Sequence, residues 1–522
     1  MNHELDEDKA ASGKDGKMNI AGASVDQMDK KKLLGFISGL VLFLLILLSD
    51  SPEDLSLAGW RTAAVVVLMA TWWVTEVISI SVTAMLPLIL FPVLSITDID
   101  TAAAPYADPM IYLFLGGFMI AIAMQRWELH RRIALNIIRF IGSKPRNIIF
   151  GFIVSSAFMS MWVSNTAATL MMLPIGLSVI QLTRKQVQSE ELQQQYQNFS
   201  VALMLAIAYA ANVGGLGTVI GTPTNALVIA FAEEAYGVEI SFVQWMTLGL
   251  PVVILGLPII FYTLANIVFP VKLKTLPGGK AFLEDEIKRL GMLSKEEKLV
   301  ALVFGLVALL WMTRPLLQGF IPELSDASIA IFGTLLLFLI PVDLKKGIFL
   351  MNWAEAKKVP WGVLILFGGG LTLASAIQKT GLAEWVGGYF TIISAWPVLL
   401  ILVIIAFIII MFTEMASNSA TAAAFLPVIG SVAIVIGQNP LLFAIPVTMV
   451  ASCAFMLPVA TPPNAIVYGS GLISIPQMTR AGFMLNIFFT LIISILGYYL
   501  FTALLGIDIG VVPEHLLSTP SN

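Results

Sequence analysis

Long apolar runs constrain the fold of this chain more than any other feature. Leu33–Ser49 and Val398–Phe412 contain no charged residue, and both approach the roughly 20 apolar residues with which an α-helix crosses a bilayer. Of the 522 residues, 58% are hydrophobic and 12% are charged, whereas about a quarter of a soluble domain is charged. Since the runs are continuous, they do not show the alternating polarity of β-barrel strands. We therefore predict an all-α polytopic membrane protein.

The charged segments between the runs predict its topology. Three consecutive lysines, Lys30–Lys32, precede the first run, and positive charge next to a span favours the cytoplasmic side. We expect residues 1–32 to be a polar cytoplasmic tail, because they lack the apolar core of a signal peptide. The acidic loop Asp50–Asp54 is expected on the outer side, and the lysine-rich segment 271–298 in the cytoplasm. These features predict a multi-pass protein with a cytoplasmic N-terminus; the family resemblance described below implies the plasma membrane, here a bacterial inner membrane.

Two polar clusters interrupt this apolar sequence. Ser164-Asn165-Thr166 recurs as Ser417-Asn418-Ser419, 253 positions later (417 − 164). Each cluster has a Leu-Pro pair ten residues after its serine and a hydroxyl one helical turn before it, Ser160 or Thr413. One such cluster is often structural, because membrane hydroxyls bond back to carbonyls of their own helix. A matched pair points instead to a site shared by two halves.

Other matches keep the same order along the chain. Gly221-Thr222-Pro223-Thr224-Asn225 is answered by Ala460-Thr461-Pro462-Pro463-Asn464 at an offset of 239 (464 − 225). Such internal repetition is typical of transporters. We predict one repeat within 33–270, which also includes the first span, a second within 299–510, and a C-terminal tail at 511–522.

Glycine clusters lie inside two further apolar stretches. We predict re-entrant helical hairpins near residues 110–126 and 362–379, because the first stretch is short for a span and precedes a basic region. The alternative is a short tilted span whose glycines lie at a helix–helix contact. Residues 148–182 are too long for one span, so we expect a helix broken at Ser-Asn-Thr, followed by a glutamine-rich loop at about 183–199.

The polar clusters suit the binding of ions. A broken helix exposes N–H groups at a helix start, which favour an anion, and carbonyls at a helix end, which favour a cation. Asn165 and Asn418 offer both an N–H donor and a C=O acceptor. Glu414, three residues before Ser417, either carries a proton or anchors the broken helix through hydrogen bonds.

Catalytic and cofactor motifs are not found in the sequence. There is no HExxH, GxxxxGK[ST] or GxSxG string, and the one cysteine, Cys453, excludes a disulfide framework. The three histidines do not form a metal-ligand cluster. We predict neither an enzyme nor a cofactor, and no nucleic-acid partner; Na⁺, as a coupling ion only, is implied by the family resemblance described next.

These motifs resemble the divalent anion:sodium symporter family, most closely its bacterial dicarboxylate transporters. The resemblance covers residues 33 to 510, and its carriers are the two Ser-Asn clusters and the string Ala451–Val467. It implies about eleven transmembrane helices and two re-entrant hairpins in inverted repeats, with scaffold and elevator-type transport domains and a homodimer. One departure is Ser419, where bacterial dicarboxylate members commonly carry threonine.

The resemblance also implies ligands. Substrate carboxylates would meet Ser164, Asn165, Thr166, Thr222, Ser417, Asn418, Ser419, Thr461 and Pro462. One Na⁺ site would use Ser160, Ser164, Asn165 and backbone near Gly221. The other would use Thr413, Ala416, Asn418 and Ala460.

The sequence thus predicts a secondary transporter that imports C4-dicarboxylates such as succinate, fumarate and malate together with Na⁺. Alternatives within the same fold are a Na⁺-independent dicarboxylate exchanger and a Na⁺-coupled citrate or sulfate carrier. A membrane-embedded enzyme and a channel are alternatives of other classes.

Overall fold

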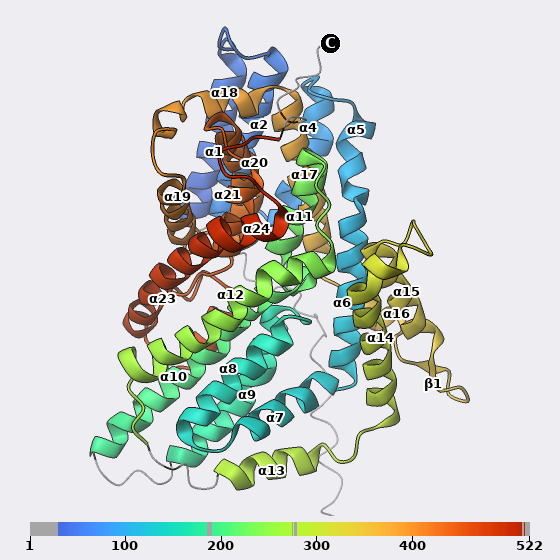
Figure 1. The fold of residues 1–522 in the computed structure, drawn as a ribbon, viewed down its shortest axis with the longest axis vertical. Coiled ribbons are helices and arrows are strands. Elements are labelled where there is room, and N and C mark those ends of the chain that lie inside the picture. Colours follow the sequence, from blue (N-terminus) through green and yellow to red (C-terminus); the bar gives the residue numbers. More distant parts are fainter. Residues whose placement is uncertain (1–29, 185–189, 274, 276–278, 514–515, 517–522) are drawn as a thin grey trace, which may run out of the picture.

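The protein is almost entirely helical (Figure 1). The computed structural model describes all residues except 1–29, 185–189, 274, 276–278, 514–515 and 517–522, so the predicted N-terminal tail lies largely outside the described residues. Within the described part, eight helices are long and apolar enough to cross a membrane, and six shorter apolar helices accompany them. The prediction of an all-α polytopic membrane protein is confirmed.

The elements of the first half run from the N-terminal helix pair, α1 and α2, to helix α12 and the short helix η4 that follows it. Their bounds are α1 Lys30–Leu48, α2 Leu57–Thr75, α3 Ile80–Thr83, α4 Pro87–Val93, α5 Ile99–Ala103, η1 Ala104–Ala107, α6 Pro109–Arg126, α7 Leu129–Ile141, α8 Pro145–Ser160, α9 Asn165–Arg184, α10 Glu190–Gly214, η2 Gly215–Gly217, η3 Val219–Gly221, α11 Pro223–Tyr236, α12 Phe242–Tyr262 and η4 Thr263–Val268.

The second half follows the same plan, with one small antiparallel sheet added. Its elements are α13 Gly279–Arg289, α14 Lys295–Leu317, α15 Asp326–Leu339, β1 Pro341–Asp343, β2 Ile348–Phe349, α16 Trp353–Ala356, α17 Trp361–Lys379, α18 Leu382–Gly388, η5 Thr391–Ile393, α19 Val398–Thr413, α20 Asn418–Val435, α21 Leu441–Ala451, α22 Pro462–Tyr468, α23 Ile475–Leu496, η6 Gly497–Phe501 and α24 Thr502–Leu505.

The two Ser-Asn clusters lie in the turns of helical hairpins. Helix α8 ends at Ser160 and α9 begins at Asn165. In the second half, α19 ends at Thr413 and α20 begins at Asn418. Figure 1 shows α8 and α9 side by side. The predicted break at the first Ser-Asn-Thr is confirmed.

The predicted positions of the hairpins at 110–126 and 362–379 are wrong. These stretches form the single helices α6 and α17, and their glycines are packing contacts. A Cβ on Gly116 would lie 2.7 Å from the Ala330 carbonyl oxygen of α15, and one on Gly369 would collide with the Ala84 carbonyl oxygen. The glycines therefore allow close helix approach, as in the alternative interpretation.

Two predicted loops are also partly helical. Helix α10 already begins at Glu190, within the glutamine-rich segment, because glutamine and glutamate are good helix formers. The charged segment 271–298 contains α13 and the start of α14. It is tied to the amphipathic helix α7 by the Arg132 Nε–Glu297 Oε1 pair at 2.7 Å and the Arg131–Glu286 pair at 3.0 Å.

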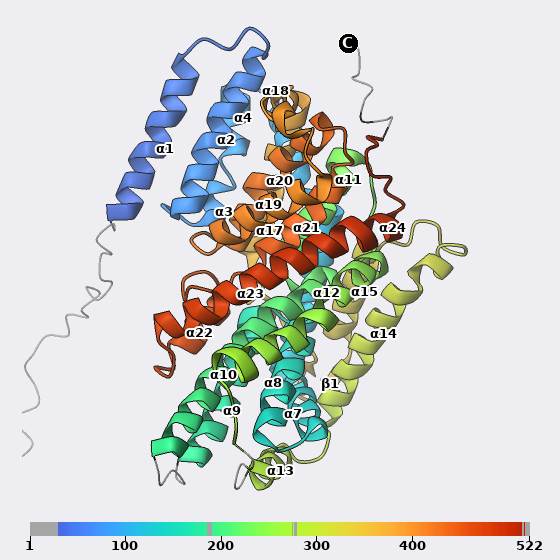
Figure 2. The same cartoon turned by 60° about the vertical axis from the view of Figure 1, so that its left-hand side comes forward.

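Figure 2 shows how the parts lie together. Helices α1 and α2 form an antiparallel pair at one side of the molecule, while α8, α9, α10 and α12 pack at the opposite end. Helix α23 crosses between them, over α21 and α12. The two hairpins and the broken helices α10–α11 and α21–α22 make up the region that holds the polar motifs.

Candidate transport site

Each hairpin tip is organised by the same side-chain hydrogen bond. The Ser160 hydroxyl donates to Asn165 Oδ1 at 2.6 Å, and the Thr413 hydroxyl donates to Asn418 Oδ1 at 2.8 Å. Both donors are fully buried last residues of α8 and α19, and both acceptors are half-buried first residues of the following helix. Within the described chain neither amide nitrogen has a protein partner, so each asparagine presents two N–H donors at a helix start.

The broken helices repeat a second pattern. In the first half, Asn225 Nδ2 donates to the carbonyls of Gly215 at 2.9 Å and Thr218 at 2.7 Å. In the second half, Asn464 Nδ2 donates to the carbonyls ten and seven residues before it, Ala454 and Leu457, both at 3.1 Å. One asparagine in each half therefore satisfies carbonyls that the unwound backbone leaves free, which is the condition for irregular backbone at membrane depth.

The two halves are interleaved at this point. Helix α22 of the second half packs against α9, and α11 of the first half packs against α20. Side chains join them as well, since Asn212 Nδ2 donates to Thr461 Oγ1 at 3.1 Å and the hydroxyls of Thr224 and Ser452 lie 2.5 Å apart. Each Ser-Asn helix thus packs against the Thr-Pro helix of the other half.

The charge distribution at the tips comes from the backbone. Helices α9, α11 and α20 begin at the polar motifs, so their free N–H groups give a partial positive charge there. The carbonyl ends of α8, α10 and α19 lie beside them. The six side chains of Ser164-Asn165-Thr166 and Ser417-Asn418-Ser419 are half-buried and uncharged. Such a region offers donors to an anion and carbonyls to a cation without a fixed counter-charge.

The residues predicted for the first Na⁺ site lie together. A Cβ on Gly215 would lie 2.6 Å from Asn165 Oδ1, and one on Gly221 would collide with the Gly215 carbonyl oxygen. The backbone near Gly221 therefore lies against Gly215, which in turn lies against the asparagine bonded to Ser160. Ser164 caps the turn, since its hydroxyl accepts from Ala167 N at 3.3 Å.

Three of the four residues predicted for the second Na⁺ site, Thr413, Ala416 and Asn418, belong to the second hairpin. The Thr413 hydroxyl, which shares its one proton with Asn418 Oδ1, also lies 3.0 Å from the Ala451 carbonyl at the end of α21. Ala416 is buried in the turn before Asn418, and Ala460 is buried just before the start of α22. Of the remaining predicted substrate contacts, Thr222 and Thr461 are buried N-caps of α11 and α22, whereas Pro462 is exposed in the first turn of α22.

Glu414 makes a set of bonds that the sequence did not reveal. Its carboxylate accepts from the backbone N–H groups of three consecutive residues, Phe455 at 2.7 Å, Met456 at 2.9 Å and Leu457 at 3.0 Å. Asn486 Nδ2 of α23 donates to it at 2.8 Å. Of the two interpretations of Glu414, this geometry favours the anchor. Asn486, an amide between the apolar residues Leu485 and Ile487 of α23, was the available signal.

Comparison with known proteins places this geometry in a family. The sequence profile described as the sodium:sulfate symporter transmembrane region matches residues 30–507. The chain belongs to this family. The chain is 43% identical over 482 residues to the sodium-dependent dicarboxylate transporter SdcS of Staphylococcus saprophyticus, covering 92% of this chain and 93% of that protein. Its identity to SdcS of Staphylococcus aureus strain USA300 is also 43%, over 483 residues, with the same coverage.

A solved structure supports the fold of this symporter-family chain. The YdaH transporter of Alcanivorax borkumensis superimposes with a TM-score of 0.52 over 89% of this chain and 96% of that one, at 13% identity. At that identity the likeness concerns the fold alone. Family membership confirms the predicted family, and it overrules the membrane-embedded enzyme because the relatives are transporters.

Proposed function

We propose that this protein is a secondary active transporter that imports C4-dicarboxylates, such as succinate, fumarate and malate, together with Na⁺. The observation that carries the proposal is the matched pair of hairpin tips. In each tip a hydroxyl bonds the asparagine oxygen and leaves the amide N–H groups unpartnered within the described chain. Two such tips suit a molecule with two carboxylates, and relatives named sodium-dependent dicarboxylate transporters support the same substrate class.

The proposed ligands are those of the sequence prediction. Substrate carboxylates bind the two Ser-Asn clusters, Thr222, Thr461 and Pro462. One Na⁺ binds Ser160, Ser164, Asn165 and Gly221 backbone, and the other binds Thr413, Ala416, Asn418 and Ala460. The support is the packing of Asn165, Gly215 and Gly221 in the first set and the Thr413 bonds to Asn418 and Ala451 in the second. Na⁺ prefers such neutral oxygens, and its charge helps to hold the dianion.

We propose an elevator-type alternating-access mechanism in a homodimer of the plasma membrane, with the N-terminus in the cytoplasm. The two inverted repeats, which lie within 33–270 and 299–510, each contribute a re-entrant hairpin, α8–α9 and α19–α20, to the moving part. The matched hydrogen bonds of Asn225 and Asn464 support the repeat. Since the bound ions largely neutralise the substrate, moving the loaded site across the membrane costs less free energy than moving the bare dianion.

Uptake of labelled succinate into proteoliposomes tests the coupling. We expect concentrative uptake with an inward Na⁺ gradient and none with an inward K⁺ or proton gradient, because only Na⁺ would fill both neutral oxygen sites. Parallel measurements with citrate and sulfate determine the substrate class. Uptake that ignores Na⁺ but rises when succinate is preloaded inside would identify an exchanger and remove both cation sites from the proposal.

Ser419→Thr tests the substrate contact that departs from the family pattern. Ser419 is half-buried in the first turn of α20, so an added methyl narrows the space next to Asn418. We expect the uptake ratio of succinate to the bulkier citrate to rise by up to about tenfold, the lower end of what one methyl group discriminates in a pocket. Competition assays give the ratio. The matched variant Ser178→Thr, at a partly exposed position of α9 more than three turns beyond its start, should leave it unchanged.

A further inference from the structure

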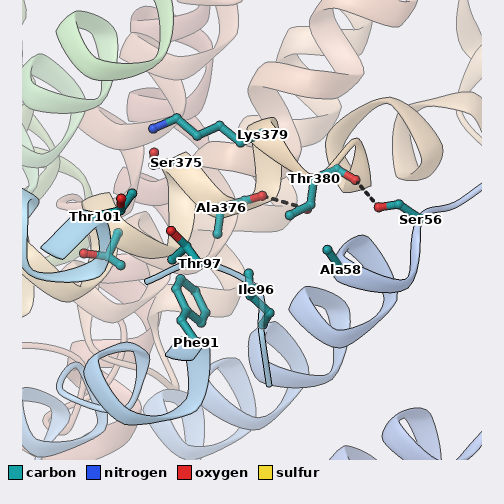
Figure 3. A pocket seen from close by; sticks show the side chains of 11 residues that line it. Ser56, Ala58, Phe91, Ile96, Thr97, Thr101, Ser375, Ala376, Lys379 and Thr380 are labelled. Atoms are coloured by element: carbon teal, nitrogen blue, oxygen red, sulfur yellow. Dashed lines mark hydrogen bonds between the residues drawn. The ribbon is translucent and has the colours of Figure 1, made fainter. Parts of the chain in front are cut away.

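A cavity of about 210 Å³ lies away from the proposed transport site, where the start of α2 meets the end of α17 (Figure 3). None of the proposed substrate or Na⁺ ligands lines it. Its walls are Ser56, Ala58, Phe91, Ile96, Thr97, Thr101, Thr372, Ser375, Ala376, Lys379 and Thr380. Seven of these eleven side chains carry a hydroxyl or an ammonium group, so the cavity is polar although its surroundings are apolar helices.

Some of these polar groups are used by the protein and others are not. Ser56 Oγ donates to the Thr380 carbonyl at 3.0 Å and Thr380 Oγ1 donates to the Ala376 carbonyl at 2.7 Å, which fixes the wall between α2 and α17. By contrast, the Lys379 ammonium and the hydroxyls of Thr97 and Ser375 have no hydrogen-bond or ion-pair partner in the described part of the chain. Three donors on the cavity wall are thus unpartnered, and one of them is charged.

The internal repeat provides a comparison for the end of α17, because the end of α6 is its counterpart in the first half. Residues of α6 and α17 correspond at the offset of the Ser-Asn clusters, 253, so Arg126 is the counterpart of Lys379 (379 − 126). The residue two positions later, which is the N-cap of the next helix, has a left-handed backbone in both halves: Glu128 at φ 53° and Gly381 at φ 77°. Around α6, Arg126 Nη1 and Trp127 Nε1 both donate to the Leu350 carbonyl, at 3.2 and 2.9 Å.

At the end of α17 these groups are replaced. The counterparts of Met119, Ile122 and Trp127 are Thr372, Ser375 and Thr380, which all line the cavity. Three large side chains are thus exchanged for small hydroxyl residues at the same positions, so that the space becomes both hollow and polar. Lys379 is exposed and has no carbonyl partner in the described chain to take the place of Leu350, so its charge is open to a ligand that arrives from solution.

We infer that this cavity is a second anion site, which binds a small oxyanion through the Lys379 ammonium and the neighbouring hydroxyls. Charge-assisted hydrogen bonds to carboxylate or phosphate oxygens are the strongest that these groups make. The nearby Asp98 does not line the cavity; the backbone N–H and hydroxyl of Thr101 donate to its carboxylate and hold its pKa below the usual value.

The source of the oxyanion follows from the position of the cavity. Ser56 follows the loop between α1 and α2, at the end of α1 opposite Lys30–Lys32. In the proposed topology this end faces the outside. A free carboxylate or phosphate reaches it from solution, and the phosphate of a lipid headgroup reaches it from the outer leaflet. Both present the same oxygens.

Binding to purified full-length protein tests the inference without transport. The protein carries Asn165→Ala and is kept free of Na⁺, so that the proposed transport site is disabled; the wild type without Na⁺ is measured in parallel. We expect calorimetric titration with succinate and with inorganic phosphate to give dissociation constants on the order of millimolar for at least one of them. Lys379→Gln should weaken binding by roughly tenfold or more, and Lys379→Arg should preserve it.

Matched variants separate the site from general charge. Ser375→Ile restores the side chain found in α6 and should abolish binding by filling the cavity. Lys345→Gln, an exposed lysine in the β1–β2 turn, should leave binding unchanged. Melting temperatures report whether each variant is folded, and the conservative Lys379→Arg variant provides the comparison if Ser375→Ile does not fold.

Native mass spectrometry on protein from phosphatidylglycerol vesicles distinguishes the lipid source. Retention of lipid by the wild type and its loss in Lys379→Gln, without titration by soluble anions, would support the site and assign it to a headgroup. If neither soluble anion nor lipid binding changes in Lys379→Gln, the inference is overturned. Since no uptake is measured, failure of the proposed dicarboxylate transport would leave this result unaffected.

Discussion

Na⁺-driven uptake should fall by at least about 100-fold when either Asn165 or Asn418 is replaced by alanine. Each amide is proposed to serve two ligands, with its oxygen at a Na⁺ site and its N–H groups at a substrate carboxylate. The buried Ser160 hydroxyl would also lose its acceptor, whereas the Thr413 hydroxyl would keep the Ala451 carbonyl. Loss of a hydrogen bond to a charged group costs about 1.5–3 kcal/mol, and two ligands are weakened together.

Uptake of labelled succinate at several Na⁺ concentrations measures this loss. The matched control is Asn136→Ala, at an exposed asparagine of α7 whose amide donates to the Arg132 carbonyl; this variant should transport normally. Protein in the membrane fraction and melting temperature show whether the variants fold. If both hairpin variants reach the membrane and take up succinate at the wild-type rate, the proposed site is in the wrong place.

A separate effect is expected on Na⁺ dependence. Because Asn165 belongs to one proposed cation site and Asn418 to the other, any residual uptake of each single variant should depend on Na⁺ with lower apparent cooperativity than the wild type. We expect Asn165→Ala and Asn418→Ala to lose substrate affinity and Na⁺ cooperativity to the same extent. The reason is the symmetry of the tips, since the hydroxyl lies five residues before the amide in each half.

The repeat explains why the polar motifs of the candidate site could be predicted from the sequence. The Ser-Asn clusters and the Thr-Pro segments follow one another in the same order in both halves of the sequence, and the matched bonds of Asn225 and Asn464 come from this same pairing. A local sequence can indicate where a helix breaks, because hydroxyls, asparagine and proline are poor interior residues of an apolar helix. The turn at Ser164 was found in this way.

The glycine stretches were misinterpreted for the opposite reason. Glycine accompanies both broken helices and close helix contacts, and the choice depends on a neighbour that is distant in sequence. Gly116 packs against Ala330, and Gly369 against Ala84. Neither partner can be identified from the glycine's own surroundings. The cavity beside Lys379 has the same origin, since it is bounded by the beginning of α2 and the end of α17.

The bonds of Glu414 were likewise hidden in long-range structure. The Glu414 carboxylate is buried, with 3% of the residue's surface exposed. The three backbone N–H groups that donate to it lie about 40 residues further along the chain. They belong to the unwound segment between α21 and α22. Without the carboxylate these donors would have no acceptor, so Glu414 holds the second hairpin tip against the broken helix of its own repeat.

We therefore expect Glu414→Ala to lower the free energy of unfolding by about 3–5 kcal/mol, the cost of leaving buried polar groups unpaired. Glu414→Gln should lower the free energy of unfolding by less than Glu414→Ala, because the amide oxygen can still accept from some of the N–H groups. It should still destabilise the protein, because the amide NH₂ group cannot accept from the others. Both variants should need more Na⁺ for half-maximal uptake, since Thr413 and Ala416 lie next to residue 414. Thermal melts with and without Na⁺, and uptake titrations, measure these effects.

The pH dependence of the Glu414→Gln variant separates anchor from proton carrier. An anchor that stays ionised gives the same uptake profile against pH in the variant and the wild type, with only the Na⁺ requirement shifted. If Glu414 carried a proton, uptake by the wild type would depend on pH and uptake by Glu414→Gln would not, and both would need the same Na⁺ concentration. Glu384→Gln, at an exposed carboxylate of α18, is the matched control for charge.

The four donors to Glu414 include Asn486. Asn486→Leu should therefore reproduce part of the Glu414→Ala destabilisation if the carboxylate acts as an anchor.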